Sequence, residues 1–122
     1  MKKLPDWLKG LPASVTVTAA DGTIVAMNPS ACDAFADDGG ADLIGRSVFD
    51  CHPEPARTKT RELFERREAN HYTIRKDGRR KIIHQLPWCR NGRFAGFVEI
   101  SIPIPDELPE FQRTTREGAA GS

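Results

Sequence analysis

The chain has 122 residues, the length of one domain, which leaves room for one core and at most one small-molecule pocket. Its 18 basic and 17 acidic residues almost cancel, so the formal net charge of +1 gives no reason to expect nucleic acid or an anionic membrane surface as a partner. Three cysteines without regular spacing do not describe a disulfide framework or a zinc site, and no apolar run approaches the ~20 residues that span a bilayer, so we expect a protein of the reducing cytoplasm.

The N-terminal segment, residues 1–12, predicts a short cap helix. Its apolar residues recur at helical spacing: Leu4, Trp7, Leu8 and Leu11. This spacing places them on one face of a helix that Gly10 and Pro12 would end. A helix this short is marginal by itself, so we expect its apolar face to dock on another surface.

Two strands joined by a tight turn are expected next. Val15 and Val17 alternate with threonines, and Ile24 to Met27 provides the return strand. Asp21-Gly22 between them is typical of a type I′ hairpin turn, in which both residues have positive φ. Asn28 then predicts a helix N-cap, because its side chain can accept a hydrogen bond from the first turn of a helix.

The middle of the chain predicts a polar loop over residues 37–42 and then the longest helix. Pro53 and Pro55 are tolerated only before a helix or in its first turn. We therefore expect this helix to begin near Ala56 and to end near Glu68.

Three further strands are expected near residues 70–76, 80–89 and 93–103. The turns between them are Asp77-Gly78 and Asn91-Gly92, both typical of two-residue hairpin loops. Past Pro105 the composition becomes polar, so residues 106–122 predict a tail or the beginning of a connector.

Two-residue turns would fix the register of these strands. The Asn91-Gly92 turn would place Ile83 opposite Ile100 and His84 opposite Glu99, and the Asp77-Gly78 turn would place His71 opposite His84. One face of the sheet would then hold Tyr72, Ile74, Ile83, Gln85, Cys89, Phe94, Val98, Ile100 and Ile102. The other face would hold His71, Thr73, Ile82, His84, Leu86, Trp88, Phe97, Glu99 and Ser101. The first face has the longer aliphatic series and is the better core.

The order of these elements resembles a known family. SVTVTAADGTIVAMNPSACDAF holds the first hairpin and helix, LIGRSVFD precedes the long helix, and HYTIRKDGRRKIIHQLPWCRNGRFAGFVEISIPI holds the last three strands. Over residues 13–105 this arrangement is similar to a PAS domain. The resemblance implies an α+β fold: a five-stranded antiparallel sheet with helices on one face and an N-terminal cap helix. It also implies a sensory or dimerisation module of a signalling pathway.

In PAS domains the pocket lies between the helices and the sheet, so the resemblance assigns the aliphatic face to the helix side. The pocket candidates taken from that face and from the long helix and its approach are Phe49, Leu63, Tyr72, Ile83, Gln85, Val98 and Ile100. Gln85 is the polar break in this face. It would either orient a ligand or satisfy buried backbone groups.

Cys51 and His52, just before the long helix, are the cofactor candidates. Haem-binding PAS domains take an axial histidine from this region, so His52 is the best haem-ligand candidate. The alternative is a capping or surface histidine. Haem is thus the best single cofactor, although the sequence leaves the cofactor open.

Two photochemical cofactors are disfavoured at Cys51. The segment Asp-Cys-His-Pro-Glu-Pro does not match the cysteine motif of the flavin photosensors of this fold. A coumaroyl chromophore would need a buried tyrosine, and the single tyrosine, Tyr72, lies on a late strand. A structural or mildly redox-active Cys51 is favoured. Cys32 and Cys89 are interpreted as packing residues.

The second sheet face carries a row, His71–His84–Glu99, that could bind a metal. The alternative is an exposed row of cross-strand pairs. Beside it, Leu86, Trp88 and Phe97 form an apolar patch that would suit the Trp7 face of the cap helix or a second subunit. A homodimer through this surface is the favoured interpretation.

No hydrolase, metalloprotease, nucleotide-binding or dinucleotide-binding motif is present in the sequence, so catalysis is not expected. The favoured function is a sensory PAS module that binds a small ligand or mediates dimerisation, with output through a separate effector. The alternatives are a haem-based gas or redox sensor using His52, and a metal or redox protein using the His71–His84–Glu99 row or Cys51.

Overall fold

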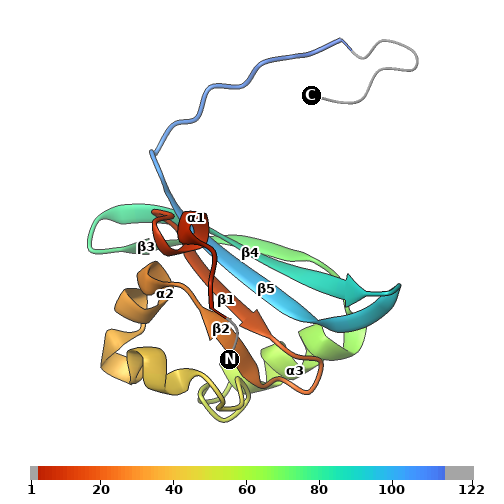
Figure 1. The fold of residues 1–122 in the computed structure, drawn as a ribbon. Helices are drawn as coiled ribbons and strands as arrows, with labels where there is room; N and C mark the ends of the chain where they lie inside the picture. Colours follow the sequence, from red (N-terminus) through yellow and green to blue (C-terminus); the bar gives the residue numbers. More distant parts are fainter. Residues whose placement is uncertain (1–2, 115–122) are drawn as a thin grey trace.

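The computed structural model describes residues 3–114 and shows one five-stranded antiparallel sheet with helices on one side (Figure 1). The strands are β1 (Ser14–Thr18), β2 (Ile24–Met27), β3 (Asn70–Lys76), β4 (Arg79–Arg90) and β5 (Arg93–Ile104). The helices are α1 (Asp6–Lys9), α2 (Pro29–Ala34), the 3₁₀ helices η1 (Ala36–Asp38) and η2 (Gly40–Leu43), and α3 (Ala56–Arg66). The strand order is β2-β1-β5-β4-β3. The predicted α+β fold is confirmed.

The hairpin turns explain how the chain reverses. Both residues of Asp77-Gly78 have positive φ (53° and 75°), as do both residues of Asn91-Gly92 (52° and 76°), so these two-residue turns are confirmed. The turn at Asp21-Gly22 differs from the predicted type I′, because of the two residues only Gly22 has positive φ. Its N–H donates to the Ala19 carbonyl at 3.0 Å, which closes a longer loop.

Asn28 joins three parts of the chain through one side chain. It is 1% exposed, and its Oδ1 accepts from the backbone N–H groups of Val15 (2.9 Å) and Ala31 (3.0 Å). Its Nδ2 donates to the carbonyls of Leu8 (3.2 Å) and Ala13 (2.8 Å). The predicted N-cap of α2 is therefore also the anchor of the N-terminal segment, and all four hydrogen-bonding positions of the buried amide are used.

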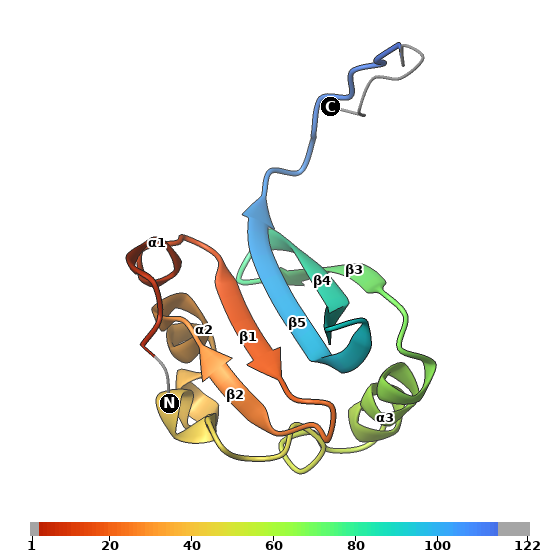
Figure 2. The same cartoon turned by 45° about the vertical axis from the view of Figure 1, so that its right-hand side comes forward.

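The N-terminal helix is shorter than its apolar spacing predicts. It spans Asp6–Lys9, and the N–H of Gly10 closes it on the Asp6 carbonyl at 3.0 Å. Trp7 is 69% exposed, so the expected docking of its side chain is not made within one copy of the chain. At the other end, the residues after β5 leave the sheet as an extended segment (Figures 1 and 2). Residues 115–122 of the predicted tail lie outside the described residues. Within residues 3–114, no helix is long and apolar enough to cross a membrane.

A β-bulge in β5 changes the register that the sequence predicts. Cys89 pairs with Phe94, but Trp88 pairs with Gly96, so Ala95 has no partner on β4. Gln85 therefore lies opposite Glu99, and His84 lies opposite Ile100. The predicted pairs Ile83–Ile100 and His84–Glu99 are wrong by one residue, because the prediction counted back from the turn without a bulge. The β3–β4 register, with His71 opposite His84, is as predicted.

The one-residue shift exchanges the two faces of β5, because side chains alternate along a strand. Phe97, Glu99 and Ser101 lie on the inner face, toward the helices, while Val98, Ile100 and Ile102 lie on the outer face. The predicted inner positions of Val98, Ile100 and Ile102 and the outer positions of Phe97, Glu99 and Ser101 are thus corrected.

The bulge also anchors α3 to the sheet. It brings Phe94 and Phe97, three residues apart, to the same side of β5, where both contact Phe64 of α3 with ring centroids 6.3 Å and 4.8 Å away. Phe49 also contacts Phe64, with ring centroids 5.1 Å apart. Aromatic pairs at such distances are favourable beyond the apolar area they bury. A second apolar cluster under α2 holds Ile24, Met27, Ala31 and Leu43.

The structure requires glycine at position 96. Gly96 has φ +146°, and a Cβ there would lie 1.9 Å from the carbonyl oxygen of Thr18. We expect Gly96→Ala to lower the free energy of unfolding by about 3 kcal/mol or more, because the backbone of β1 or β5 must move. The control Gly92→Ala, at a turn with open space around the added Cβ, should cost only about 1 kcal/mol. Urea unfolding measures both, and equal losses would contradict the close approach.

Candidate functional site

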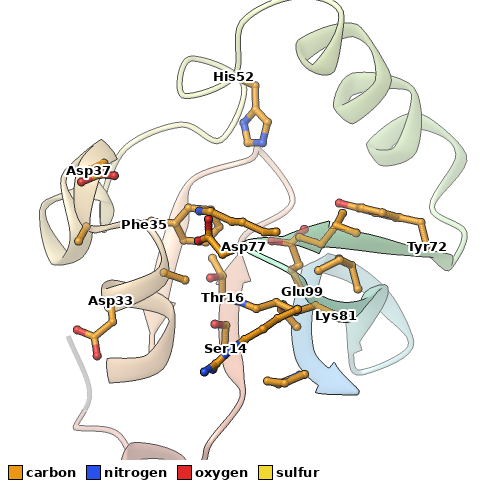
Figure 3. Close-up of a pocket in the computed structure, with 18 residues that line it drawn as sticks. Ser14, Thr16, Asp33, Phe35, Asp37, His52, Tyr72, Asp77, Lys81 and Glu99 are labelled. Carbon is orange, nitrogen blue, oxygen red and sulfur yellow. The ribbon is translucent and has the colours of Figure 1, made fainter. Parts of the chain in front are cut away.

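A cavity of about 840 Å³ lies between the inner face of the sheet and the segment from α2 to the approach of α3 (Figure 3). Its floor is formed by β1, β3, β4 and β5, and its wall by α2, η1 and His52. The lining residues are Ser14, Thr16, Asp33, Ala34, Phe35, Ala36, Asp37, His52, Tyr72, Ile74, Lys76, Asp77, Arg79, Lys81, Ile83, Glu99, Ser101 and Pro103. Its volume is in the range of small-molecule sites.

The floor changes chemistry along the strands. Lys76, Arg79 and Lys81 lie at the β3–β4 hairpin end. Apolar and hydroxyl groups follow in the middle, where Tyr72 and Ser101 flank Ile83. The opposite end is polar, because the bulge brings Glu99 onto the floor.

At the polar end, hydrogen bonds join Asn70, Gln85 and Glu99 in a row across β3, β4 and β5. Asn70 Nδ2 donates to Gln85 Oε1 at 2.8 Å, and Gln85 Nε2 donates to Glu99 Oε1 at 3.0 Å. Gln85 thus donates to the Glu99 side chain, which lines the cavity. Burial raises the pKa of the Tyr72 phenol above its ordinary value of 10.0, and the negative charge of Glu99 raises it further. Tyr72 is therefore a neutral hydrogen-bond donor at the edge of this row.

His52 is oriented by the backbone just before it. Its Nδ1 lies 2.7 Å from the Val48 carbonyl, and because a carbonyl only accepts, Nδ1 carries the proton. In the neutral imidazole Nε2 is then the acceptor, and the ring points toward the cavity (Figure 3). A ring N–H that donates to a backbone carbonyl is a usual way in which a metal-ligating imidazole is oriented.

The other sequence candidates lie apart from this cavity. Cys51 is half-buried and packs against the cluster under α2. Phe49 and the α3 residue Phe64 line a separate small hollow, while Leu63 is half-buried on α3. Val98 and Ile100 lie on the outer face of the sheet. Of the predicted pocket residues, the structure brings His52, Tyr72 and Ile83 together, with Gln85 held at the Glu99 carboxylate.

The predicted metal row is divided between the two faces of the sheet. His71 and His84 do meet on the outer face, with their Nδ1 atoms 2.8 Å apart. Glu99, however, lies on the inner face, because the bulge reverses its direction. Among the residues that the structure describes, no three His, Cys, Asp or Glu side chains form a metal-binding group. The His71–His84–Glu99 metal hypothesis is therefore wrong in its geometry.

The sequence analysis missed the basic part of the floor. Lys76 and Lys81 share a face with Ile74 and Ile83 by simple alternation, so the signal was present in the strand pattern. The inner position of Glu99 depended on the bulge instead. Its signal was Gly96, since a glycine inside a strand pattern is typical of a bulge or of close backbone approach.

Comparison with known proteins agrees with this architecture. A sequence model of the PAS fold matches residues 8–107. No curated protein matches the chain in sequence.

Solved structures share the fold at low identity. The C-terminal domain of a Streptococcus mutans protein has a TM-score of 0.67 and 21% identity, covering 79% of this chain and 78% of that one. The PAS domain of Bordetella pertussis BvgS has a TM-score of 0.63 and 18% identity, with coverages of 81% and 82%. The Aer2 receptor of Vibrio cholerae, described as a dual PAS-heme oxygen sensor, has a TM-score of 0.58 and 12% identity, with coverages of 76% and 95%. At these identities the likeness concerns the fold alone.

The effect of the Glu99 charge on Tyr72 can be tested by titration. Tyr72 is the single tyrosine of the chain, so tyrosinate absorbance reports on it alone. We expect Glu99→Gln to lower the Tyr72 pKa, while the part of the shift due to burial remains. Because the folded-state pKa is raised, the unfolded chain ionises first, and stability falls as pH rises above about 10. An unchanged Tyr72 pKa in Glu99→Gln, or an equal decrease in the control Asp42→Asn, would contradict an effect of the Glu99 charge.

Proposed function

Because the chain belongs to the PAS fold family, we propose that it is the sensory module of a signalling pathway, with a small ligand bound in the cavity over the sheet. The cavity is the observation that supports this function. It combines an apolar middle with polar groups at both ends, as sites that orient a small molecule do. The role is sensory and not catalytic, and output passes to a separate effector. The three free cysteines fit a cytoplasmic location.

The second part of the proposal is self-association through the outer face of the sheet. The register correction makes this face more apolar than the sequence predicted. Its apolar residues are Val15, Val17, Ile82, Leu86, Trp88, Val98, Ile100 and Ile102. All but Val15 keep exposed area in a single copy, and Ile102 is 37% exposed. A second copy of the chain, with its exposed Trp7, is the partner whose chemistry suits this surface.

A haem-binding gas or redox sensor is the second candidate, supported by the orientation of His52. A free Nε2 that faces a cavity, with Nδ1–H held by a carbonyl, suits an axial ligand. Haem held in this way would supply an iron that binds diatomic gases or changes oxidation state. The named Aer2 receptor is a haem sensor of the same fold, and this likeness carries over only as a hypothesis.

Ligand binding can be tested by filling the cavity. Ser101 lies at the centre of the floor, opposite Ile83 and Ser14. After incubation with a deproteinised cell extract, native mass spectrometry should detect wild-type protein carrying a small molecule. Ser101→Trp should lose this added mass, because the indole occupies the same space. Absence of any bound mass in the wild type, or its persistence in the variant, would contradict the function.

Self-association can be tested by sedimentation velocity. We expect a concentration-dependent dimer that Ile100→Lys weakens by roughly tenfold or more, since a lysine would be desolvated at the centre of the interface. Trp7→Ala should weaken it less. Glu62→Lys, an exposed change on α3, is the control. A wild type that sediments as a monomer at all concentrations would overturn this part of the proposal.

The haem candidate predicts a sharp Soret band when haemin is added to the purified protein. His52→Ala should abolish the band, because it removes the oriented Nε2 donor. His84→Ala, a histidine on the other face of the sheet, should leave it unchanged. A featureless spectrum, or a band that survives in His52→Ala, would exclude this candidate.

A further inference from the structure

The β3–β4 hairpin distributes its basic residues over the two faces of the sheet in unequal environments. On the outer face, Arg75 forms an ion pair with Asp106 at 2.8 Å, and Arg80 donates to the Asp106 backbone carbonyl at 3.1 Å. On the inner face, Lys76, Arg79 and Lys81 all line the cavity. Within residues 3–114, no acidic side chain forms an ion pair with any of these three.

The inner basic residues therefore form a positive end of the cavity, where the one acidic side chain of the same hairpin, Asp77, also lines the wall but forms no ion pair with them. Lys76 and Arg79 lie directly opposite each other, and like charges in a cross-strand pair are destabilising. Lys81 is half-buried against the same floor. This partial burial strengthens the attraction between Lys81 and an anion because it reduces screening by solvent, whereas Lys76 and Arg79 are exposed.

The opposite end of the floor has the complementary chemistry. Lys81 pairs with Pro103, four residues along β5 from Glu99, which corresponds to about 14 Å of strand. There Glu99 and His52 Nε2 both present acceptors. Between the two ends lie Ile83 and the ring of Tyr72. Figure 3 shows Glu99, Lys81 and Tyr72 around one space, with the Asp33 carboxylate directed away from it.

On the premise of the ligand-binding function proposed above, we propose that the ligand is a small organic anion with a hydrogen-bond donor at its far end. Its acid group, a carboxylate in the simplest case, binds between Lys81 and the Lys76–Arg79 pair. Its apolar body packs over Ile83 and Tyr72. A hydroxyl or amino group at the other end donates to Glu99 or to His52 Nε2.

A matched pair of fluorescent probes tests the charge requirement. 8-Anilinonaphthalene-1-sulfonate carries an anionic group and an amine donor on an aromatic body, and N-phenyl-1-naphthylamine is the neutral analogue without the sulfonate. The wild type should bind the anionic probe more tightly. The double variant Arg79→Met, Lys81→Met should lower the affinity for that probe by about tenfold or more. Its affinity for the neutral probe should be unchanged.

Arg80→Met is the matched control, because it removes the cation between these two positions in β4 but on the outer face. This variant should change the affinity for neither probe. Ser101→Trp should displace both probes from the cavity, and circular dichroism checks that each variant is folded.

The outcomes separate this inference from the function on which it rests. Equal affinities for the two probes, or no effect of the double variant on the anionic probe, would overturn the anion inference while cavity binding stands. Binding of both probes that survives Ser101→Trp would place them outside the cavity and overturn the inference. Failure of both probes to bind would overturn it as well, and would count against the cavity as a ligand site.

Discussion

The close approach of Gly96 to the Thr18 carbonyl is the constraint on which the rest of the structure depends. No Cβ fits there, and two more contacts gather at the same point. Phe97 N–H donates to Thr18 Oγ1 at 3.1 Å, and Trp88 Nε1 donates to the Thr18 carbonyl at 3.0 Å. Contacts of Thr18 with β5 and with β4 therefore fix the position of the bulge at Ala95. The bulge fixes which β5 side chains face the helices, and so determines which residues line the cavity.

The consequences reach both faces of the sheet. On the inner side the bulge supplies Phe94 and Phe97 to the aromatic cluster that holds α3, and Glu99 to the polar end of the floor. On the outer side it moves Ile100 and Ile102 into a continuous apolar surface. Asn28 has a similar role at the other edge, where one buried amide joins β1, α2 and the N-terminal segment. Two local features thus position the floor and the wall of the same site.

Much of this could be predicted from local chemistry, and the failures have a physical pattern. Asp77-Gly78 and Asn91-Gly92 act through their own φ angles, and the cap at Asn28 acts through a neighbouring N–H, so each was visible in the sequence. The β5 register was not, because Gly96 is required by a contact with Thr18, 78 positions earlier in the chain. Because the prediction lacked the unpaired Ala95, it placed Val98, Glu99 and Ile100 on the wrong faces of the sheet. His52 was identified, but its orientation by the Val48 carbonyl needed the fold. The α1 spacing predicted too long a helix, because the helix begins only after Pro5, whose backbone is extended, while Gly10 ends it as predicted.

The register of β4 against β5 is the most direct test of this account. Nuclear Overhauser effects between backbone protons of facing residues report strand pairing without any mutation. We predict effects that join Gln85 with Glu99 and His84 with Ile100, and none that give Ala95 a partner on β4. Effects that join His84 with Glu99 and Ile83 with Ile100 would show a regular hairpin without the bulge. That result would remove Glu99 from the cavity and contradict the site described above.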